Sequence, residues 1–100
     1  MSGLFNPPHP GRILKESLDY LGISTRRFAR DIGVSPSTAA KVLKEEAPIR
    51  PELAIRISAA MPGPSPEVWL SIQASYDLWQ LRDRLDVSSI TRLVPSSVNL

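Results

Sequence analysis

The residues best suited to chemistry in this sequence form a basic segment before its midpoint. Between Ser24 and Lys44 there are five basic side chains and one acidic one, which gives this segment a charge of +4 in a chain whose net charge is +2. The basic residues are Arg26, Arg27, Arg30, Lys41 and Lys44. Clustered cations release counterions when they meet phosphates, and this release drives much of DNA binding. The segment therefore indicates a nucleic-acid interface, although an ordinary solvated charged face is the alternative.

Side-chain chemistry divides the expected DNA contacts into two groups. Lysine can donate to guanine acceptors and a small apolar side chain can meet a thymine methyl group, so we expect base reading from one set. This set comprises Ser35, Pro36, Ser37, Ala40, Lys41 and Lys44. Hydroxyl and guanidinium groups near helix N-termini suit phosphate oxygens instead. This second set comprises Thr25, Arg26, Arg27 and Thr38.

No other cluster of residues predicts catalysis or metal binding. The chain has no cysteine and one histidine, His9, so neither a thiolate site nor a histidine-based zinc centre is expected, and no cofactor is predicted. We expect His9 to cap or pack against the first helix. Glu45 and Glu46 are adjacent and should diverge at a helix end, which favours a solvated pair over two catalytic carboxylates. We therefore predict that the protein is not an enzyme.

Two short helices must hold the basic segment in place. Ser24 can cap a helix over Thr25–Ile32, which Gly33 would end, and Ser35 with Pro36 can start a second one that runs to about Lys44. Small and aliphatic residues suit the crossing of these helices, namely Ala29, Val34, Ala39 and Val42. This pattern is typical of a helix-turn-helix over residues 25–44, although a helical hairpin without a DNA role has the same outline.

Prolines, glycines and apolar spacings of three and four residues predict three further helices. We expect them over Pro10–Leu21, from Pro51 to about Met61 with Leu53, Ile57 and Ala60 facing the core, and from Pro66 to about Leu85. The predicted fold is all-α, with an arm over residues 1–9, a five-helix domain over 10–85 and a tail over 86–100. Within the tail, residues Ile90–Val94 could form a short strand.

The last predicted helix has two apolar stripes. One contains Trp69, Ile72, Tyr76 and Trp79, and the other contains Leu70, Ala74, Leu78, Leu81 and Leu85. A single small domain can bury one stripe, which leaves the other for a second subunit. We therefore expect a homodimer through this helix and the tail. The predicted interface residues are Trp69, Ile72, Tyr76, Trp79 and Ile90.

The sequence also bears on where the protein acts. It contains no apolar run of the roughly 18 residues that a membrane span needs, and its first residues lack the pattern of a signal peptide. A cytoplasmic protein without membrane contact, associated with the nucleoid when bound to DNA, is the expectation.

Two motifs outside the basic segment point to a known family. The run from Asn6 to Leu14, NPPHPGRIL, and the segment around Pro66–Leu70, PEVWL, followed by Gln73 and Tyr76–Leu78, resemble those of HigA-type antitoxins. These antitoxins are a branch of the Cro/C1-like (XRE) helix-turn-helix family, and the resemblance covers about residues 5–82. Thr25 and Pro36 depart from the pattern, since the branch usually has Gln and a long polar residue there.

The resemblance implies a five-helix lambda-repressor-like domain and a dimeric repressor that binds its own operator. It also implies a cognate toxin partner that cleaves mRNA and that this protein neutralises. Two alternatives remain open: a helix-turn-helix repressor without a toxin, and a protein-interaction module without specific DNA binding.

Overall fold

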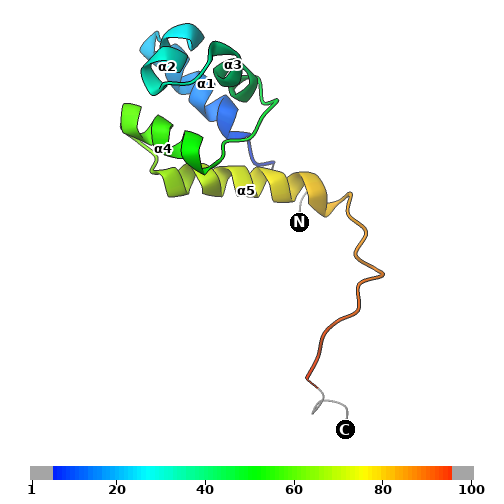
Figure 1. Cartoon of the computed structure of the whole chain (residues 1–100). Coiled ribbons are helices and arrows are strands. Elements are labelled where there is room, and N and C mark those ends of the chain that lie inside the picture. Colours follow the sequence, from blue (N-terminus) through cyan, green and yellow to red (C-terminus); the bar gives the residue numbers. More distant parts are fainter. Residues whose placement is uncertain (1–5, 96–100) are drawn as a thin grey trace.

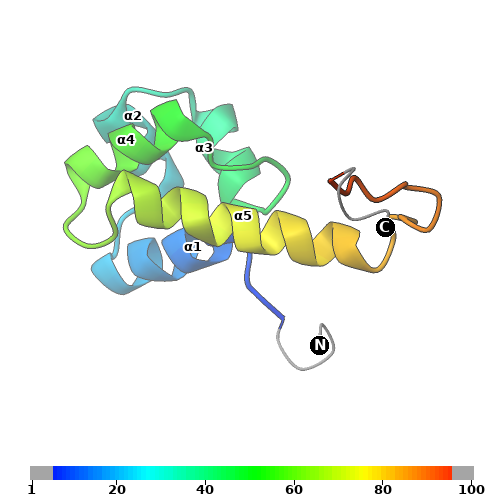
Figure 2. The same cartoon turned by 90° about the horizontal axis from the view of Figure 1, so that it is seen from below.

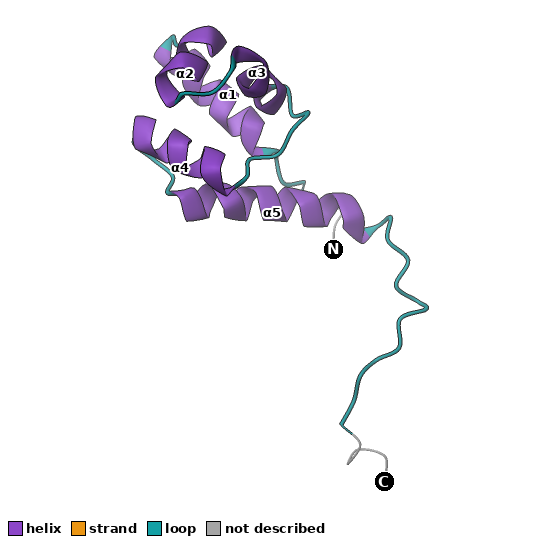
Figure 3. Ribbon diagram, in the orientation of Figure 1, coloured by secondary structure: helices purple, strands orange, loops and turns teal. Residues whose placement is uncertain are grey.

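The computed structural model describes residues 6–95, which contain five helices and no strand (Figures 1 and 3). The helices are α1 (Pro10–Leu21), α2 (Thr25–Ile32), α3 (Pro36–Leu43), α4 (Pro51–Ala60) and α5 (Pro66–Arg82). The all-α prediction is therefore confirmed. Residues 1–5 of the predicted arm and 96–100 of the predicted tail lie outside the described residues.

Side-chain caps begin four of the five described helices where the sequence predicts, and only α4 has none. The hydroxyls of Ser24, Ser35 and Ser65 accept hydrogen bonds from the backbone N–H groups at the third helical positions of α2, α3 and α5, at 3.1, 3.1 and 3.3 Å. His9 caps α1, since its Nδ1 accepts from the Gly11 N–H at 2.9 Å. These contacts satisfy N–H groups that have no partner within a helix.

Two of the five helices in residues 6–95 end at glycines. Gly22 and Gly33 adopt the left-handed conformation after α1 and α2, with φ of 70° and 78°. After α3 the same position is taken by Glu45, with φ of 65°. The Glu45 N–H donates to the Val42 carbonyl and the Glu46 N–H to the Lys41 carbonyl, at 3.0 and 2.8 Å. This is the Schellman arrangement, in which glycine is the favoured residue.

The core lies where α1, α2, α3 and α4 meet the first half of α5. Its buried apolar side chains are Leu14, Leu18, Phe28, Ala29, Ile32, Ala39, Val42, Leu43, Ile49, Ala54, Ile57 and Trp69. In two perpendicular views α5 runs along the side of the domain formed by α1 and α4 (Figures 1 and 2). On α4 the prediction of Ala60 in the core is wrong, because the buried face is centred on Ala54 and Ile57 and the helix ends with Ala59 and Ala60 exposed.

Gly11 lets α1 approach α3 at close range. A Cβ atom placed on Gly11 would lie 1.9 Å from the Val42 carbonyl oxygen, which is far inside van der Waals contact. The first turn of α1 therefore rests directly on the backbone of α3.

The chain leaves the domain after α5. This helix ends at Arg82, three residues before the predicted end at Leu85, although the Leu85 N–H still donates to the Leu81 carbonyl at 2.8 Å. The following residues extend away from the helices (Figure 1). Over Ile90–Val94 the predicted strand is absent, because nothing else in residues 6–95 forms a strand with which it could pair.

Candidate nucleic-acid interface

The α2–α3 pair has the geometry of a helix-turn-helix. Ala29, Ala39 and Val42 are buried between the two helices, and the partly buried Val34 packs against this core from the turn after Gly33. The Val34 N–H donates to the Ala29 carbonyl at 3.0 Å, which closes the end of α2. Packing on the inner side of α3 leaves its outer side free to face a ligand.

That outer side contains most of the residues predicted to read bases. Ser35, Pro36, Ser37, Lys41 and Lys44 are exposed, and Ala40 is half-buried. Lys41 and Lys44 form no ion pair with any residue in 6–95, so their charges are available to a ligand. An α-helix with small and basic side chains on its outer side fits the major groove of DNA, which is about 12 Å wide.

Three hydroxyls are grouped at the start of α3. The Ser35 Oγ accepts from the Thr38 N–H and donates to the Thr38 Oγ1 at 2.8 Å, and it lies 3.2 Å from the Ser37 Oγ. A hydroxyl has one proton to donate. Ser35 is therefore engaged as the cap, whereas Thr38 keeps its own proton for an outside acceptor such as a phosphate oxygen.

The residues predicted to grip phosphates differ in their electrostatic surroundings. Arg26 is exposed and makes no ion pair within the described chain. Arg27 and Arg30 both flank Asp31, with their Nε atoms 3.4 and 3.5 Å from its carboxylate oxygens. Thr25 is half-buried. Arg26 therefore presents the least compensated charge on α2.

Arg56 is a residue near this site that the sequence reasoning missed. From α4 its Nη1 donates to the Ile32 carbonyl at 2.9 Å, and its Nε donates to the Glu52 Oε2 at 3.0 Å. The spacing of Glu52 and Arg56 is a sequence signal for an ion pair on a helix. The contact with Ile32 joins residues 24 positions apart and has no such signal.

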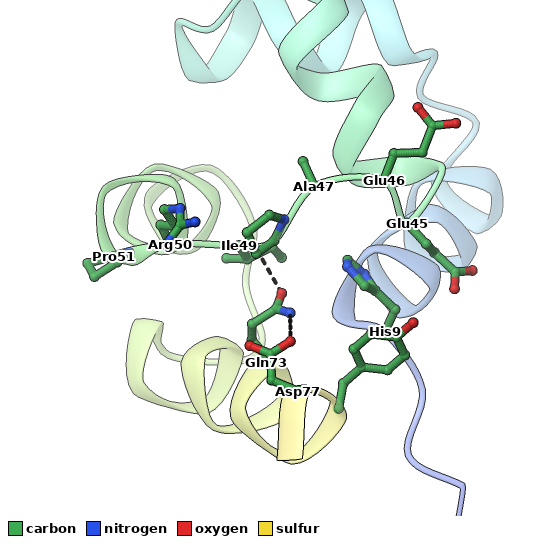
Figure 4. A pocket seen from close by; sticks show the side chains of 11 residues that line it. His9, Glu45, Glu46, Ala47, Ile49, Arg50, Pro51, Gln73 and Asp77 are labelled. Carbon is green, nitrogen blue, oxygen red and sulfur yellow. Dashed lines mark hydrogen bonds between the residues drawn. The ribbon is translucent and has the colours of Figure 1, made fainter. Parts of the chain in front are cut away.

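His9 lies away from this surface, in a cleft of about 380 Å³ bounded by α5 and the α3–α4 connection (Figure 4). Its buried ring meets Tyr76 edge-on, with the ring centroids 4.9 Å apart. Burial lowers the pKa of His9, while Glu45, Asp77 and the backbone of Ala47 oppose the shift. The predicted capping and packing role of His9 is therefore confirmed.

Gln73 joins the same connection to α5. Its Oε1 accepts from the Ile49 N–H at 2.8 Å, and its Nε2 donates to the Asp77 Oδ1 at 2.9 Å (Figure 4). Glu45 and Glu46 at the rim are both exposed, as predicted for a solvated pair. In the part of the chain that the structure describes, no group of three histidine or carboxylate side chains is placed to hold a metal ion.

The stripes on α5 are partly reassigned by the structure. Trp69, predicted at a subunit interface, is only 2% exposed and belongs to the core of the single chain. Ile72, Tyr76 and Trp79 are half-buried, and Ile90 in the tail is 66% exposed. The exposed large apolar side chains on α5 are Val68, Leu78 and Leu81, and Leu85 and Val87 are exposed just after its end.

Among residues 6–95 no helix is both long and apolar enough to cross a membrane.

Bacterial regulators and antitoxins are among the known proteins similar to the chain. It is 44% identical over 89 residues to the uncharacterised HTH-type transcriptional regulator YddM of Escherichia coli, covering 89% of this chain and 94% of that protein. It is 37% identical over 79 residues to the antitoxin HigA-1 of Vibrio cholerae, covering 78% and 73%. No protein-family model matches the chain.

Solved structures give the same picture. The antitoxin GraA superposes with a TM-score of 0.82 at 31% identity, covering 89% of this chain and 99% of GraA. PA4674 of Pseudomonas aeruginosa, solved in complex with its 28 bp operator DNA, has a TM-score of 0.75 at 28% identity and covers 87% and 99%. These names describe regulators and antitoxins and none of them denotes an enzyme.

Proposed function

Because the chain belongs to the HigA-type antitoxins of the helix-turn-helix family, we propose that it is the antitoxin of a toxin–antitoxin module that represses its own operon. Through the outer side of α3 it binds operator DNA in a sequence-specific manner. Through another surface it neutralises a cognate toxin that cleaves mRNA. Binding its own operator places it in the cytoplasm, at the nucleoid.

The observation that carries this proposal is the outer side of α3. It combines the hydroxyls of Ser37 and Thr38 with Lys41 and Lys44, which form no ion pair with any residue in 6–95, and all four side chains are exposed. In this arrangement Ser37, Ala40 and Lys41 read base edges, together with Pro36 and Lys44, whereas Thr25, Arg26, Arg27 and Thr38 hold phosphates. Ser35 acts mainly as the helix cap that orients them.

A dimer through α5 and the tail accompanies this function. Leu78 and Leu81 leave an apolar row uncovered on α5, which Leu85, Val87 and Ile90 continue after the helix, beside the half-buried Ile72, Tyr76 and Trp79. Pairing two such rows about a two-fold axis removes them from water. It also places two copies of α3 on half-sites about 34 Å apart, one turn of DNA.

DNA binding can be tested by an anisotropy titration with the DNA upstream of the gene at two salt concentrations, with scrambled DNA as competitor. We expect tight binding that resists the competitor and weakens steeply with salt, because several phosphates are contacted. Equal affinity for the scrambled DNA would refute operator recognition and leave the helix-turn-helix as a scaffold for protein binding.

A transcriptional repressor without a toxin is the second candidate, since the 44% identical relative is named as a regulator rather than an antitoxin. Co-expression with the neighbouring open reading frame separates the two. An antitoxin rescues growth and co-purifies with that product. Failure of both, with operator binding intact, would identify the repressor.

A further inference from the structure

We propose that Arg56 is a positioning residue for DNA recognition: it ties α4 to the end of α2 and thereby sets the direction in which α3 leaves the turn. The role in recognition rests on the proposed operator binding. The tether itself stands on the contacts of the guanidinium with Ile32, Gly33 and Glu52.

The Ile32 carbonyl is a group that α2 cannot satisfy by itself. The last carbonyls of a helix lack a partner in the following turn, and this one lies beside the buried Ile32 side chain. Arg56 supplies the donor, with its Nη1 at 2.9 Å from the oxygen. A hydrogen bond from a charged donor to a partly buried acceptor is stronger than one between neutral groups.

A second contact, made by the Nε of Arg56, fixes the orientation of the guanidinium. Glu52, one turn earlier on α4, accepts from the Arg56 Nε at 3.0 Å. Because the guanidinium is planar, this second contact directs Nη1 toward Ile32, and a lysine could not make both contacts in the same geometry. Glu52 also compensates the charge of Arg56, which makes Arg56 a weaker candidate for a phosphate contact than Arg26, which forms no ion pair in residues 6–95.

Gly33 links the tether to the direction of α3. Its φ is 78°, and a Cβ atom at this position would lie 2.9 Å from the Arg56 Nη1, so the guanidinium sits directly against the turn. Only Val34 and Ser35 separate Gly33 from the start of α3 at Pro36. A change in the direction of the Ile32 carbonyl is therefore passed to α3 within three residues.

Few other contacts between α4 and α3 could replace this tether. α4 packs mainly on α2 and α5. Between α4 and α3 lies an apolar cleft of about 300 Å³, bordered by Val34, Thr38, Val42, Leu53 and Arg56 among others. The cleft leaves room for α3 to tilt if the guanidinium is removed.

The test compares Arg56→Gln and Arg56→Lys with the matched control Arg12→Gln. Arg12 forms the same kind of pair with Glu16 four residues along α1, with 3.7 Å between Nε and Oε2, but it has no contact with the turn. Affinities for operator and scrambled DNA are measured at several salt concentrations, well below the melting temperature of each variant. Amide hydrogen exchange of Gly33 and Val34 is measured without DNA.

We expect Arg56→Gln to lose operator affinity by about tenfold or more, the scale of one hydrogen bond from a charged group, and Arg56→Lys to show part of this loss. Affinity for scrambled DNA and the salt slope should stay unchanged. The amides of Gly33 and Val34 should exchange faster in Arg56→Gln, since they close the end of α2. Arg12→Gln should alter none of these quantities.

Three results would overturn the proposal. A lower melting temperature with an unchanged ratio of operator to scrambled affinity would assign Arg56 to stability alone. Equal losses on both DNAs with a salt slope smaller by about one would make it a direct phosphate contact. If the unaltered protein does not prefer its operator, the proposed function fails, and unchanged exchange at Gly33 and Val34 would separately refute the tether.

Discussion

The His9 ring meets the Tyr76 ring edge-on, with 4.9 Å between the centroids and 73° between the planes, so the start of α1 is packed onto the middle of α5. The His9 Nδ1 also caps α1 by accepting from the Gly11 N–H. One side chain thus starts the first helix and joins it to the last. The cap requires the neutral imidazole, because a protonated Nδ1 cannot accept a hydrogen bond.

Acidification should therefore destabilise the protein through His9. Its pKa is lowered from the ordinary value of 6.5, chiefly by burial, so the folded state binds the proton less well than the unfolded state. The free energy of unfolding should be highest above pH 6.5 and fall as the pH decreases through 6.5 toward the lowered pKa. Urea unfolding between pH 7.5 and 5.5 measures this, and His9→Gln, which leaves no histidine, should flatten the profile. A stability that rises on acidification would contradict the prediction.

Glu45→Gly should stabilise the protein by about 1 kcal/mol, because a left-handed residue other than glycine costs about 1–2 kcal/mol, of which part is offset by the freedom of glycine in the unfolded chain. Urea unfolding at pH 7 is the measurement. Glu46→Gly is the matched control, since Glu46 has no positive φ and its replacement should only destabilise. Similar effects of the two substitutions would show that the backbone strain at Glu45 is unimportant.

Gly11→Ala should destabilise the protein by about 3 kcal/mol, even though alanine is the better helix former. The reason is the 1.9 Å approach of a Cβ atom to the Val42 carbonyl, which is backbone and cannot swing away. Gly22→Ala is the comparison: nothing lies within 4 Å of its Cβ, and its φ of 70° alone should cost about 1 kcal/mol. Chemical unfolding of both variants ranks the two effects, and a neutral Gly11→Ala would contradict the close approach of α1 and α3.

Two substitutions on the helix-turn-helix should have different effects on DNA binding. Arg26→Ala should weaken binding to all sequences alike and reduce the salt slope by about one, as expected for a phosphate contact. Lys41→Ala should instead relax the preference at one base position, at a cost of about 1–3 kcal/mol on the operator. Titrations against operator variants with single base changes distinguish uniform weakening from a relaxed preference at one position. Identical behaviour of the two variants would refute the division into phosphate and base contacts.

Leu81→Glu should convert a dimer to a monomer and weaken operator binding by loss of the second half-site. Leu81 is exposed on α5 in the single chain, so a charge there leaves the fold intact but cannot be buried at an interface. Light scattering at micromolar concentration is the measurement. Ile55→Glu, at an exposed apolar site on α4, is the control and should stay dimeric. A wild-type protein that is itself monomeric would exclude this dimer.

Most of the helix-turn-helix could be predicted because its signals are local. Ser24 and Ser35 accept hydrogen bonds from N–H groups three residues along the chain, and Gly33 ends α2 because its φ of 78° is left-handed. Such contacts form within a single turn and need no knowledge of the rest of the fold. The outward placement of Lys41 and Lys44 then follows from helical periodicity.

The apolar stripes on α5 show where local reasoning stops. Periodicity identified two stripes, and the prediction placed the stripe that contains Trp69 at a subunit interface. The structure places Trp69 in the core and leaves Leu78 and Leu81 uncovered, because α5 continues beyond the helices on which its first half packs. The strand predicted over Ile90–Val94 is absent for a similar reason, since nothing else in residues 6–95 forms a strand with which it could pair.

The sequence by itself determined the helices, their caps, the turn between α2 and α3 and the basic outer side of α3, because each depends on residues within three or four positions of one another. Only the tertiary structure decided that Gly11 lies against Val42, that Arg56 reaches Ile32 and that His9 packs on Tyr76. Those pairs lie 24 to 67 positions apart in the chain. They meet only because the packing of whole helices places them together, and no local pattern encodes that packing.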